Sequence, residues 1–205
     1  VIAERRKLMA GDTKKRILKV ALELFAQKGY LGTSMRDIAQ QLGLTKAALY
    51  KHYTAKQDIL DKIIERMNEM DAQRAKEYGM PETEDASEAY LHTPADKIRS
   101  YALAQFGHWT EEKFSSDFRK MLTLEQYRDP EMAQLYQTYL AEGPLSYMEE
   151  VFVEITSDKK MASQFALEFY GPIFLLYSIY DGAKDKKQVV KMVERHVEEF
   201  AKRIE

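Results

Sequence analysis

The sequence contains no cysteine, so disulfide bridges, thiolate metal sites and thiol nucleophiles are excluded. This composition favours a protein of the reducing cytoplasm. Long hydrophobic runs are missing too, because the most apolar stretch, residues 172–180, is less than half of the roughly 20 residues that cross a bilayer. No apolar segment follows the charges at the N-terminus, so we expect neither a signal peptide nor membrane association.

Common catalytic patterns are absent as well. The sequence has no Gly-rich phosphate loop and no serine in a nucleophile elbow. A di-iron helical bundle needs Glu-x-x-His pairs, and none of the 4 histidines has a glutamate three residues before it. We therefore expect no enzyme activity, no metal site and no cofactor.

Negative charge does not dominate every part of the chain, although the net charge is -2. Residues 1–56 hold 12 Lys and Arg against 4 Asp and Glu, whereas residues 57–205 hold 19 against 29. A basic head on an acidic body suits a protein whose head meets phosphates while its body is repelled from them. A chance excess of lysines on a solvated face is the alternative.

Apolar residues recur at helical spacing along most of the chain, and no stretch alternates as a strand would. We predict an all-α fold of about nine helices. Their expected ranges are 13–28, 34–42, 46–52, 55–77, 94–114, 116–127, 130–155, 159–181 and 186–203. Gly143-Pro144 should kink the helix over 130–155 or split it in two.

Three short helices are compressed between Ser34 and Lys56, and such short helices are stable only when they pack on one another. Residues 34–37 and 54–57 each have the form of a capping box. Between them, Gly43-Leu44-Thr45 provides a left-handed stop, an apolar plug and a new N-cap in three residues. This arrangement predicts the tight turn of a helix-turn-helix motif.

Packing does not explain the outward residues of the second helix of this motif, which include Lys46, Tyr50, Lys51 and His52, followed by Lys56. Cations and hydrogen-bonding aromatics at the start of a short helix suit contacts with phosphates and the major groove. A solvated polar face is the alternative interpretation.

The run from Gly29 to Ala39, continued by Leu42 to Tyr53, Lys56 and Leu60, resembles the N-terminal motif of the TetR family of bacterial transcriptional regulators. The resemblance implies a DNA-binding domain over residues 1–56 and a helical effector-binding and dimerisation domain over 57–205. It also implies a cytoplasmic repressor that binds a pseudo-palindromic double-stranded operator as a homodimer and is released by a small-molecule effector.

Residue by residue, the resemblance implies that Arg36 reaches a base or phosphate. It places Lys46, Ala47, Ala48 and Lys51 in the major groove and Tyr50, His52 and Lys56 mainly on the backbone. The predicted DNA-binding residues, which include two caps, are Ser34, Arg36, Thr45, Lys46, Ala47, Ala48, Tyr50, Lys51, His52 and Lys56.

Aromatic residues and methionines are frequent in the body, where they suit either a plain core or a cavity with apolar walls and a few polar tips. The resemblance favours an effector pocket. Its candidate residues are Phe106, Trp109, Phe118, Met121, Tyr136, Tyr139, Phe169, Phe174 and Tyr177.

The last two predicted helices are unusually apolar for surface elements and look like half of a four-helix bundle. In the family, these helices pair across a two-fold axis. The residues predicted for the dimer interface are Phe165, Pro172, Leu176, Val189, Val193, Val197 and Phe200.

Two alternatives stay open for the body. The last two helices could form an internal core pair of a monomer. The whole body could also be a protein-interaction module without a small-molecule effector, attached to the same DNA-binding head.

Overall fold

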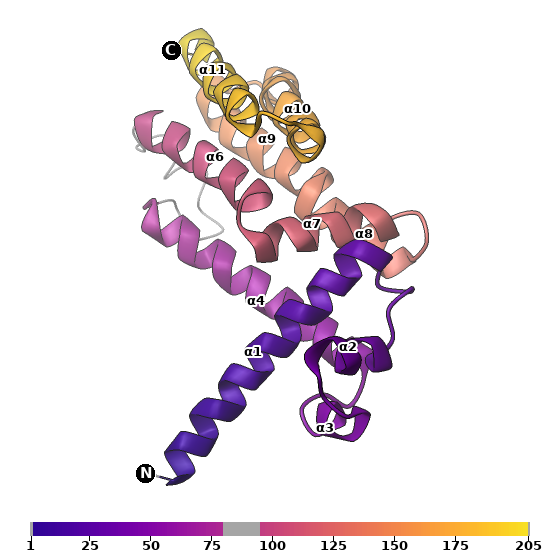
Figure 1. The fold of residues 1–205 in the computed structure, drawn as a ribbon. Coiled ribbons are helices and arrows are strands. Elements are labelled where there is room, and N and C mark those ends of the chain that lie inside the picture. The colour runs from indigo at the N-terminus through magenta and orange to yellow at the C-terminus, as the bar shows by residue number, and fades with distance from the viewer. Residues whose placement is uncertain (1, 80–94, 205) are drawn as a thin grey trace. The chain divides into compact units, whose positions relative to one another are not determined.

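A computed structural model describes residues 2–79 and 95–204, and within these ranges it contains only helices. The all-α prediction is therefore confirmed. The helices are α1 (Ile2–Lys28), α2 (Met35–Leu42), α3 (Lys46–Tyr50), α4 (Lys56–Glu77), α6 (Ala95–Thr110), α7 (Lys113–Glu125), α8 (Pro130–Leu140), α9 (Glu142–Thr156), α10 (Lys159–Gly182) and α11 (Lys186–Ile204) (Figure 1).

The predicted helix over 130–155 is split into α8 and α9, as Gly143-Pro144 led us to expect. Proline cannot donate the backbone hydrogen bond that an uninterrupted helix needs. A Cβ at Gly143 would overlap the carbonyl oxygen of Thr138, so the close approach of the two segments requires glycine. The largest difference from prediction lies in α1, which begins at Ile2 rather than at residue 13.

The chain divides into two compact units, Val1–Met70 with Asp117–Ala133, and Asp71–Ser116 with Gln134–Glu205. We call them the head unit and the body unit. The division predicted at residue 56 stays a prediction about function, because the contacts join most of α4 and part of α7 to the head unit.

The head unit is built around apolar residues that recur at helical spacing on each of its helices. Ile17, Ala21 and Phe25 of α1 are completely buried, as are Ile38 of α2 and Leu49 of α3. The side chain of Arg16 fastens α1 to the end of α2 by donating to the Leu42 carbonyl oxygen at 3.0 Å. Figure 1 shows α2 and α3 next to each other, where they pack together.

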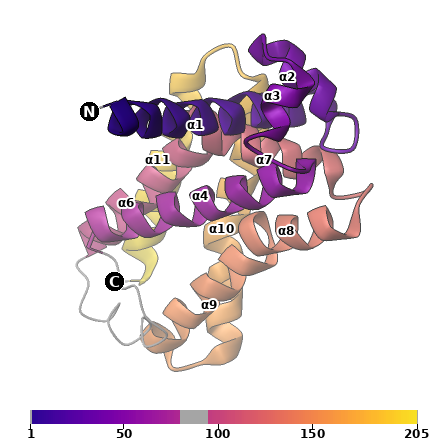
Figure 2. The same cartoon turned by 90° about the horizontal axis from the view of Figure 1, so that it is seen from below.

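The body unit is organised around α10, which packs against α6, α9 and α11. Figure 2 shows α9 and α10 running side by side. Phe152 of α9, Phe169 of α10 and Phe200 of α11 meet with ring centroids 5.0–6.1 Å apart, so aromatic packing closes the space between these three helices. Among the described residues, no helix is both long and apolar enough to cross a membrane.

Candidate nucleic-acid interface

Helix α2 starts with the capping box that the sequence predicts. The Ser34 hydroxyl accepts from the backbone N–H of Asp37 at 3.2 Å, and the Asp37 carboxylate accepts from the Ser34 N–H at 2.8 Å. The Ser34 hydroxyl also donates to this carboxylate, and these hydrogen bonds lower the pKa of Asp37. The box fixes the point at which the chain enters the motif and leaves neighbouring Arg36 exposed.

The turn between α2 and α3 also follows the prediction. Gly43 has a φ of 67°, a left-handed conformation that costs glycine nothing. The N–H of Leu44 then donates to the carbonyl oxygen of Ala39 at 2.9 Å, and the Thr45 hydroxyl accepts from the N–H of Ala48 at 3.1 Å. The turn therefore starts α3 at a defined angle to α2.

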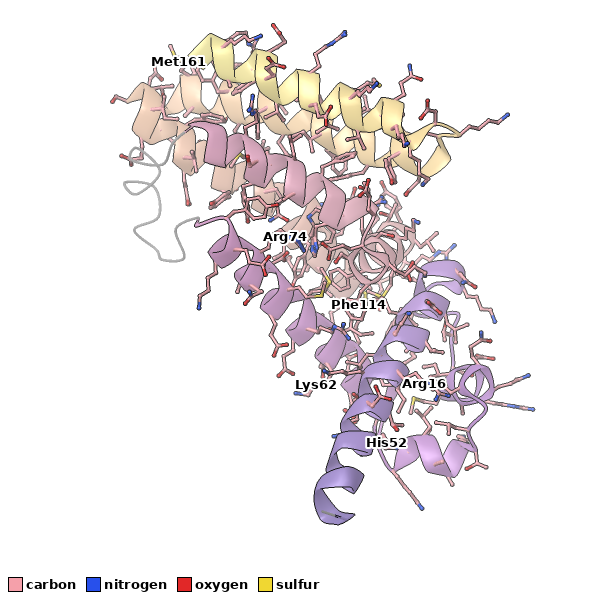
Figure 3. All side chains as sticks on the ribbon, turned by 60° about the vertical axis from the view of Figure 1, so that its left-hand side comes forward. Arg16, His52, Lys62, Arg74, Phe114 and Met161 are labelled. Atoms are coloured by element: carbon pink, nitrogen blue, oxygen red, sulfur yellow. The ribbon has the colours of Figure 1, made fainter. Side chains whose placement is uncertain are left out.

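Helix α3 presents a cationic and aromatic face to solvent. Lys46, Ala47, Tyr50 and Lys51 are exposed, whereas Leu49 is fully buried and anchors the helix. The Lys46 ammonium lies 5.6 Å from the centre of the Tyr50 ring, so the two side chains share one face, as their spacing of four residues requires. Ala48 and His52 are half-buried at its margins. Figure 3 labels His52 beside this helix.

The predicted capping box at residues 54–57 is wrong in its partner. The backbone N–H groups of Thr54 and Ala55 both donate to Asp58, at 2.9 and 3.0 Å, rather than to Gln57. Because α4 begins at Lys56, Ala55 is the N-cap and Asp58 is the third helical residue, which is the box position for an acid. The hydrogen bonds, led by that of the Thr54 hydroxyl, lower the pKa of Asp58.

Lys56 makes intramolecular contacts that the sequence did not predict. Its ammonium donates to the carbonyl oxygens of Tyr30 and Thr33 at 2.6 and 2.8 Å and lies 4.2 Å from the centre of the Tyr30 ring. Burial lowers the pKa of Lys56. The side chain thus ties α4 to the chain between α1 and α2, and its contact with a DNA phosphate stays a prediction.

Sequence reasoning missed a set of polar contacts at the base of the head unit. Glu125 of α7 is fully buried and accepts from the backbone N–H of Leu31 at 3.3 Å. The Tyr30 hydroxyl donates to Gln57 at 2.7 Å, and Gln57 donates to Glu131 at 3.3 Å. Burial, together with Glu131 and other nearby carboxylates, raises the pKa of Tyr30 to about 12. No local signal marks these partners, because 94 residues separate Leu31 from Glu125.

The predicted effector residues do not form one group. Phe118 and Met121 are fully buried in the head unit, while the other seven belong to the body unit. Within the body unit, Phe106 stacks on Tyr177 at 5.4 Å, and Trp109 meets Tyr139 at 6.4 Å. Phe169 belongs to the aromatic contacts among α9, α10 and α11. Tyr136 is half-buried, and Phe174 is exposed beside Tyr170.

Most residues predicted for the dimer interface are buried inside their own chain. Phe165 and Pro172 are half-buried. The fully packed members are Leu176, Val189, Val193, Val197 and Phe200. Their side chains fill the core between α10, α11 and their neighbours, so they are not the surface that a partner would meet. The large apolar residues exposed on these two helices are Met161, Leu167, Phe174, Leu175, Ile179 and Met192.

A shallow depression of about 450 Å³ is also present on α10 and α11, lined by Glu168, His196, Glu199, Phe200 and Arg203. Arg203 closes one side by donating to Glu168 at 3.0 Å. Phe200 is the one residue here that the sequence analysis had selected. Within the described chain, no group of three or more His, Cys, Asp or Glu residues could hold a metal ion.

Comparison with known proteins gives a consistent result for the head. Residues 17–63 match the family model of bacterial regulatory proteins, tetR family. The HTH-type transcriptional regulator AcrR of Shigella flexneri is 41% identical over 64 residues, which are 31% of this chain and 30% of AcrR. The biofilm operon icaADBC negative regulator IcaR of Staphylococcus epidermidis is 42% identical over 52 residues, which are 25% of this chain and 28% of IcaR. The matched segments therefore span less than a third of either relative.

The fold extends the likeness over most of the chain. The structure of AibR in complex with isovaleryl coenzyme A and operator DNA superposes with a TM-score of 0.61, covering 88% of this chain and 95% of AibR at 20% identity. The motif from Ser34 to Lys56 thus lies in a segment that matches the family model, on a fold that family members share. The chain belongs to the TetR family of bacterial regulatory proteins.

Proposed function

We propose that the protein is a transcriptional repressor that binds a pseudo-palindromic operator as a homodimer and releases it when a small molecule binds the body unit. The observation that carries the proposal is the exposed face of α3, where Lys46, Tyr50 and Lys51 surround a helix held in place by Leu49. The named relatives are regulators rather than enzymes, in agreement with the expectation of a non-catalytic protein.

DNA recognition by α3 follows from its size and charge. Residues at the start of a recognition helix reach base edges, and lysines at its flanks neutralise phosphates. The ten DNA-binding residues predicted from the sequence remain our proposal for the contacts. Among them, Ser34 and Thr45 act first as caps, and Lys56 acts first as a tie to Tyr30 and Thr33.

Control by an effector is supported by the continuity of α4. This helix begins at Lys56, which holds the chain before α2, and continues to Glu77 in the body unit. A ligand that favours one position of its far end therefore also favours one position of its near end. About 5.5 kcal/mol of differential affinity would change the DNA-binding population from 99:1 to 1:99.

Selection of bound sequences from random DNA tests the operator. A recovered palindrome with half-sites about one helical turn apart supports the homodimer, and a single undivided site contradicts it.

The contacts of α3 are tested with Lys46→Ala and Tyr50→Ala. We expect each substitution to weaken binding to the selected operator by roughly tenfold or more, and Lys46→Ala to make the salt dependence shallower by about one unit if it removes a phosphate contact. Fluorescence anisotropy with labelled operator measures both effects. Lys202→Ala removes the same charge from an exposed lysine of α11 and should leave affinity unchanged. Normal affinity in both α3 variants would contradict the proposed recognition face.

The alternative function keeps the DNA-binding head but makes the body a protein-interaction module. An exposed apolar strip on α10 is the observation that favours it. If a broad ligand screen changes neither operator affinity nor body stability, while a protein partner changes both, the alternative is the better description.

A further inference from the structure

A cluster of polar side chains lies in the body unit where the end of α4 meets α6. It consists of Asp71 and Arg74 of α4, Gln105 and His108 of α6, and Glu112, and we call it the His108 cluster. The His108 side chain is completely shielded from solvent. Its Nδ1 lies 3.1 Å from Glu112, and its Nε2 lies 3.2 Å from Asp71. Figure 3 labels Arg74, which extends from α4 toward this cluster and also contacts His108.

Several atoms of this cluster have no hydrogen-bond partner. Residues 2–79 and 95–204 contain five buried side-chain atoms of this kind, and four of them are Asp71 Oδ1, Arg74 Nε, Gln105 Oε1 and His108 Nε2. Nε2 of His108 is near Asp71 but is not aligned for a hydrogen bond. Buried polar atoms are nearly always paired in native proteins, so a concentration at one place indicates that something else occupies it.

The charges of the cluster do not balance. Two carboxylates, Asp71 and Glu112, face the single guanidinium of Arg74. Arg74 donates to both oxygens of Glu112, at 3.0 and 3.2 Å, and so is committed to that residue. Among the described residues, Asp71 has only His108 as an ion-pair partner. A cation complements this arrangement, whereas an anion would meet an uncompensated carboxylate.

Aromatic side chains form an apolar wall beside the cluster. Tyr78, Tyr101 and Tyr147, which we call the tyrosine wall, pack around Val151. The Tyr78 and Tyr101 rings lie 6.0 Å apart. Gln105 joins wall and cluster, because its amide nitrogen donates to the Tyr101 hydroxyl at 2.7 Å while its oxygen stays unpaired. Burial raises the pKa of Tyr101, and nearby Asp71 adds to the rise.

We propose that the His108 cluster and the tyrosine wall form a binding site for a protonated amine carried on an apolar body. The ammonium donates to Asp71 Oδ1 and Gln105 Oε1, the two unpaired acceptors, and the tyrosine rings receive the apolar part and interact with the charge through their faces. The side chains of Asp71 and Glu112 are 31% and 43% exposed, which gives the ligand a route from solvent.

Binding at this site also acts on α4. Asp71 lies 15 residues after Lys56 on the same helix, which corresponds to about 22 Å along its axis. The role of the amine as the effector rests on the proposed function, whereas binding of the amine does not. The two ideas can therefore fail separately.

Four probes with the same apolar chain test the ligand class: octylamine, octyltrimethylammonium, octanol and octanoate. Fluorescence of the single tryptophan, Trp109, reports binding directly, because its ring lies 5.1 Å from that of His108. We expect octylamine to bind most tightly, octyltrimethylammonium less tightly because it cannot donate hydrogen bonds, and octanoate most weakly. Octanoate binding as tight as that of octylamine, or no binding of any probe, would overturn the proposal.

Substitutions then assign the ammonium site. Asp71→Asn should weaken octylamine about tenfold or more and leave octanol unchanged, because a charge-assisted hydrogen bond is lost. Glu69→Gln makes the same change of charge on the exposed face of α4 and should have no effect. If Asp71→Asn does not fold, Gln105→Met serves instead, with weaker octylamine binding as the expected result. Equal octylamine affinity in the substituted and unsubstituted proteins rejects the site.

Operator anisotropy in the presence of octylamine separates the two ideas. If octylamine binds in an Asp71-dependent manner, the site is supported whether or not DNA is released. If the protein keeps its operator affinity with saturated amine, effector control through this site is refuted. If octanoate releases DNA while octylamine does not bind, the ligand class is wrong and effector control stands.

Discussion

At the scale of single residues, Gly29 shows how the head unit depends on a distant acid. Its φ is 82°, which an L side chain rarely adopts. A Cβ at this position would also overlap the Glu125 carboxylate, whose other contact is with the N–H of Leu31. Gly43 has a similar φ of 67°, but a Cβ there would meet nothing within 4 Å. The two glycines therefore separate conformational strain from crowding.

We predict that Gly29→Ala lowers the free energy of unfolding more than Gly43→Ala does. The left-handed conformation costs an alanine about 1 kcal/mol or more at either position. Gly29→Ala must in addition displace buried Glu125. Urea unfolding followed by circular dichroism measures both variants. Equal losses would mean that Glu125 moves aside freely and does not hold the 29–31 segment.

At the scale of helices, the two starts that frame the DNA-reading motif rely on aspartates. Asp37 accepts hydrogen bonds at the start of α2, and Asp58 does so at the start of α4. These bonds keep the pKa of both carboxyls below its ordinary value. Helix α3 has five residues and no acid in its first turn, so it depends on the Thr45 cap and on packing through Leu49. Such a short helix is not stable by itself.

The caps make the stability of the head depend on acid pH. Because the folded pKa of both aspartates lies below the unfolded value of about 3.9, their contribution is present above that pH and is lost as pH falls through the folded pKa. We predict that Asp37→Asn with Asp58→Asn lowers stability at pH 7 and flattens its dependence between about pH 5 and 2. Urea unfolding across this range checks it. Parallel pH curves for the two proteins would contradict the role of the caps.

At the scale of the whole molecule, dimerisation has to use apolar residues that the chain leaves exposed. Leu167 and Leu175 of α10 are 55% and 59% exposed, and Ile179 is 40% exposed. They recur at intervals of eight and four residues and so share one side of the helix, with Gly171 between them. A glycine there permits close approach of a partner helix. We propose this strip as the homodimer surface in place of the buried residues that the sequence suggested.

We predict that Leu175→Glu converts the protein from a dimer to a monomer of 23.9 kDa, because dimerisation would bury an unpaired charge. Light scattering coupled to gel filtration measures the mass. Operator affinity should fall as well, since two heads are no longer held on two half-sites. Tyr127→Glu, at an apolar residue 89% exposed in the head unit, is the control and should stay dimeric. A dimeric Leu175→Glu protein would place the interface elsewhere.

The helix-turn-helix motif could be predicted from the sequence because its signals are local. The Ser34 box, the Gly43 turn and the Thr45 cap each involve residues within about five positions of one another. Helical periodicity likewise located the elements and the break at Gly143. The error at residues 54–57 arose because Gln57 and Asp58 are both adjacent acceptors, and only the true start of α4 decides between them.

What only the tertiary structure decided involves partners that are distant in the chain. Glu125 meets Leu31 across 94 residues, and Arg74 meets His108 across 34. Periodicity shows that a helix such as α11 has an apolar face, but the same pattern serves a core or an interface. The protein itself buries Val193 and Phe200 and leaves Leu175 exposed. The sequence thus determined the helices and the DNA-reading motif through local hydrogen bonding, while long-range packing determined which faces and charges remain for a partner or a ligand.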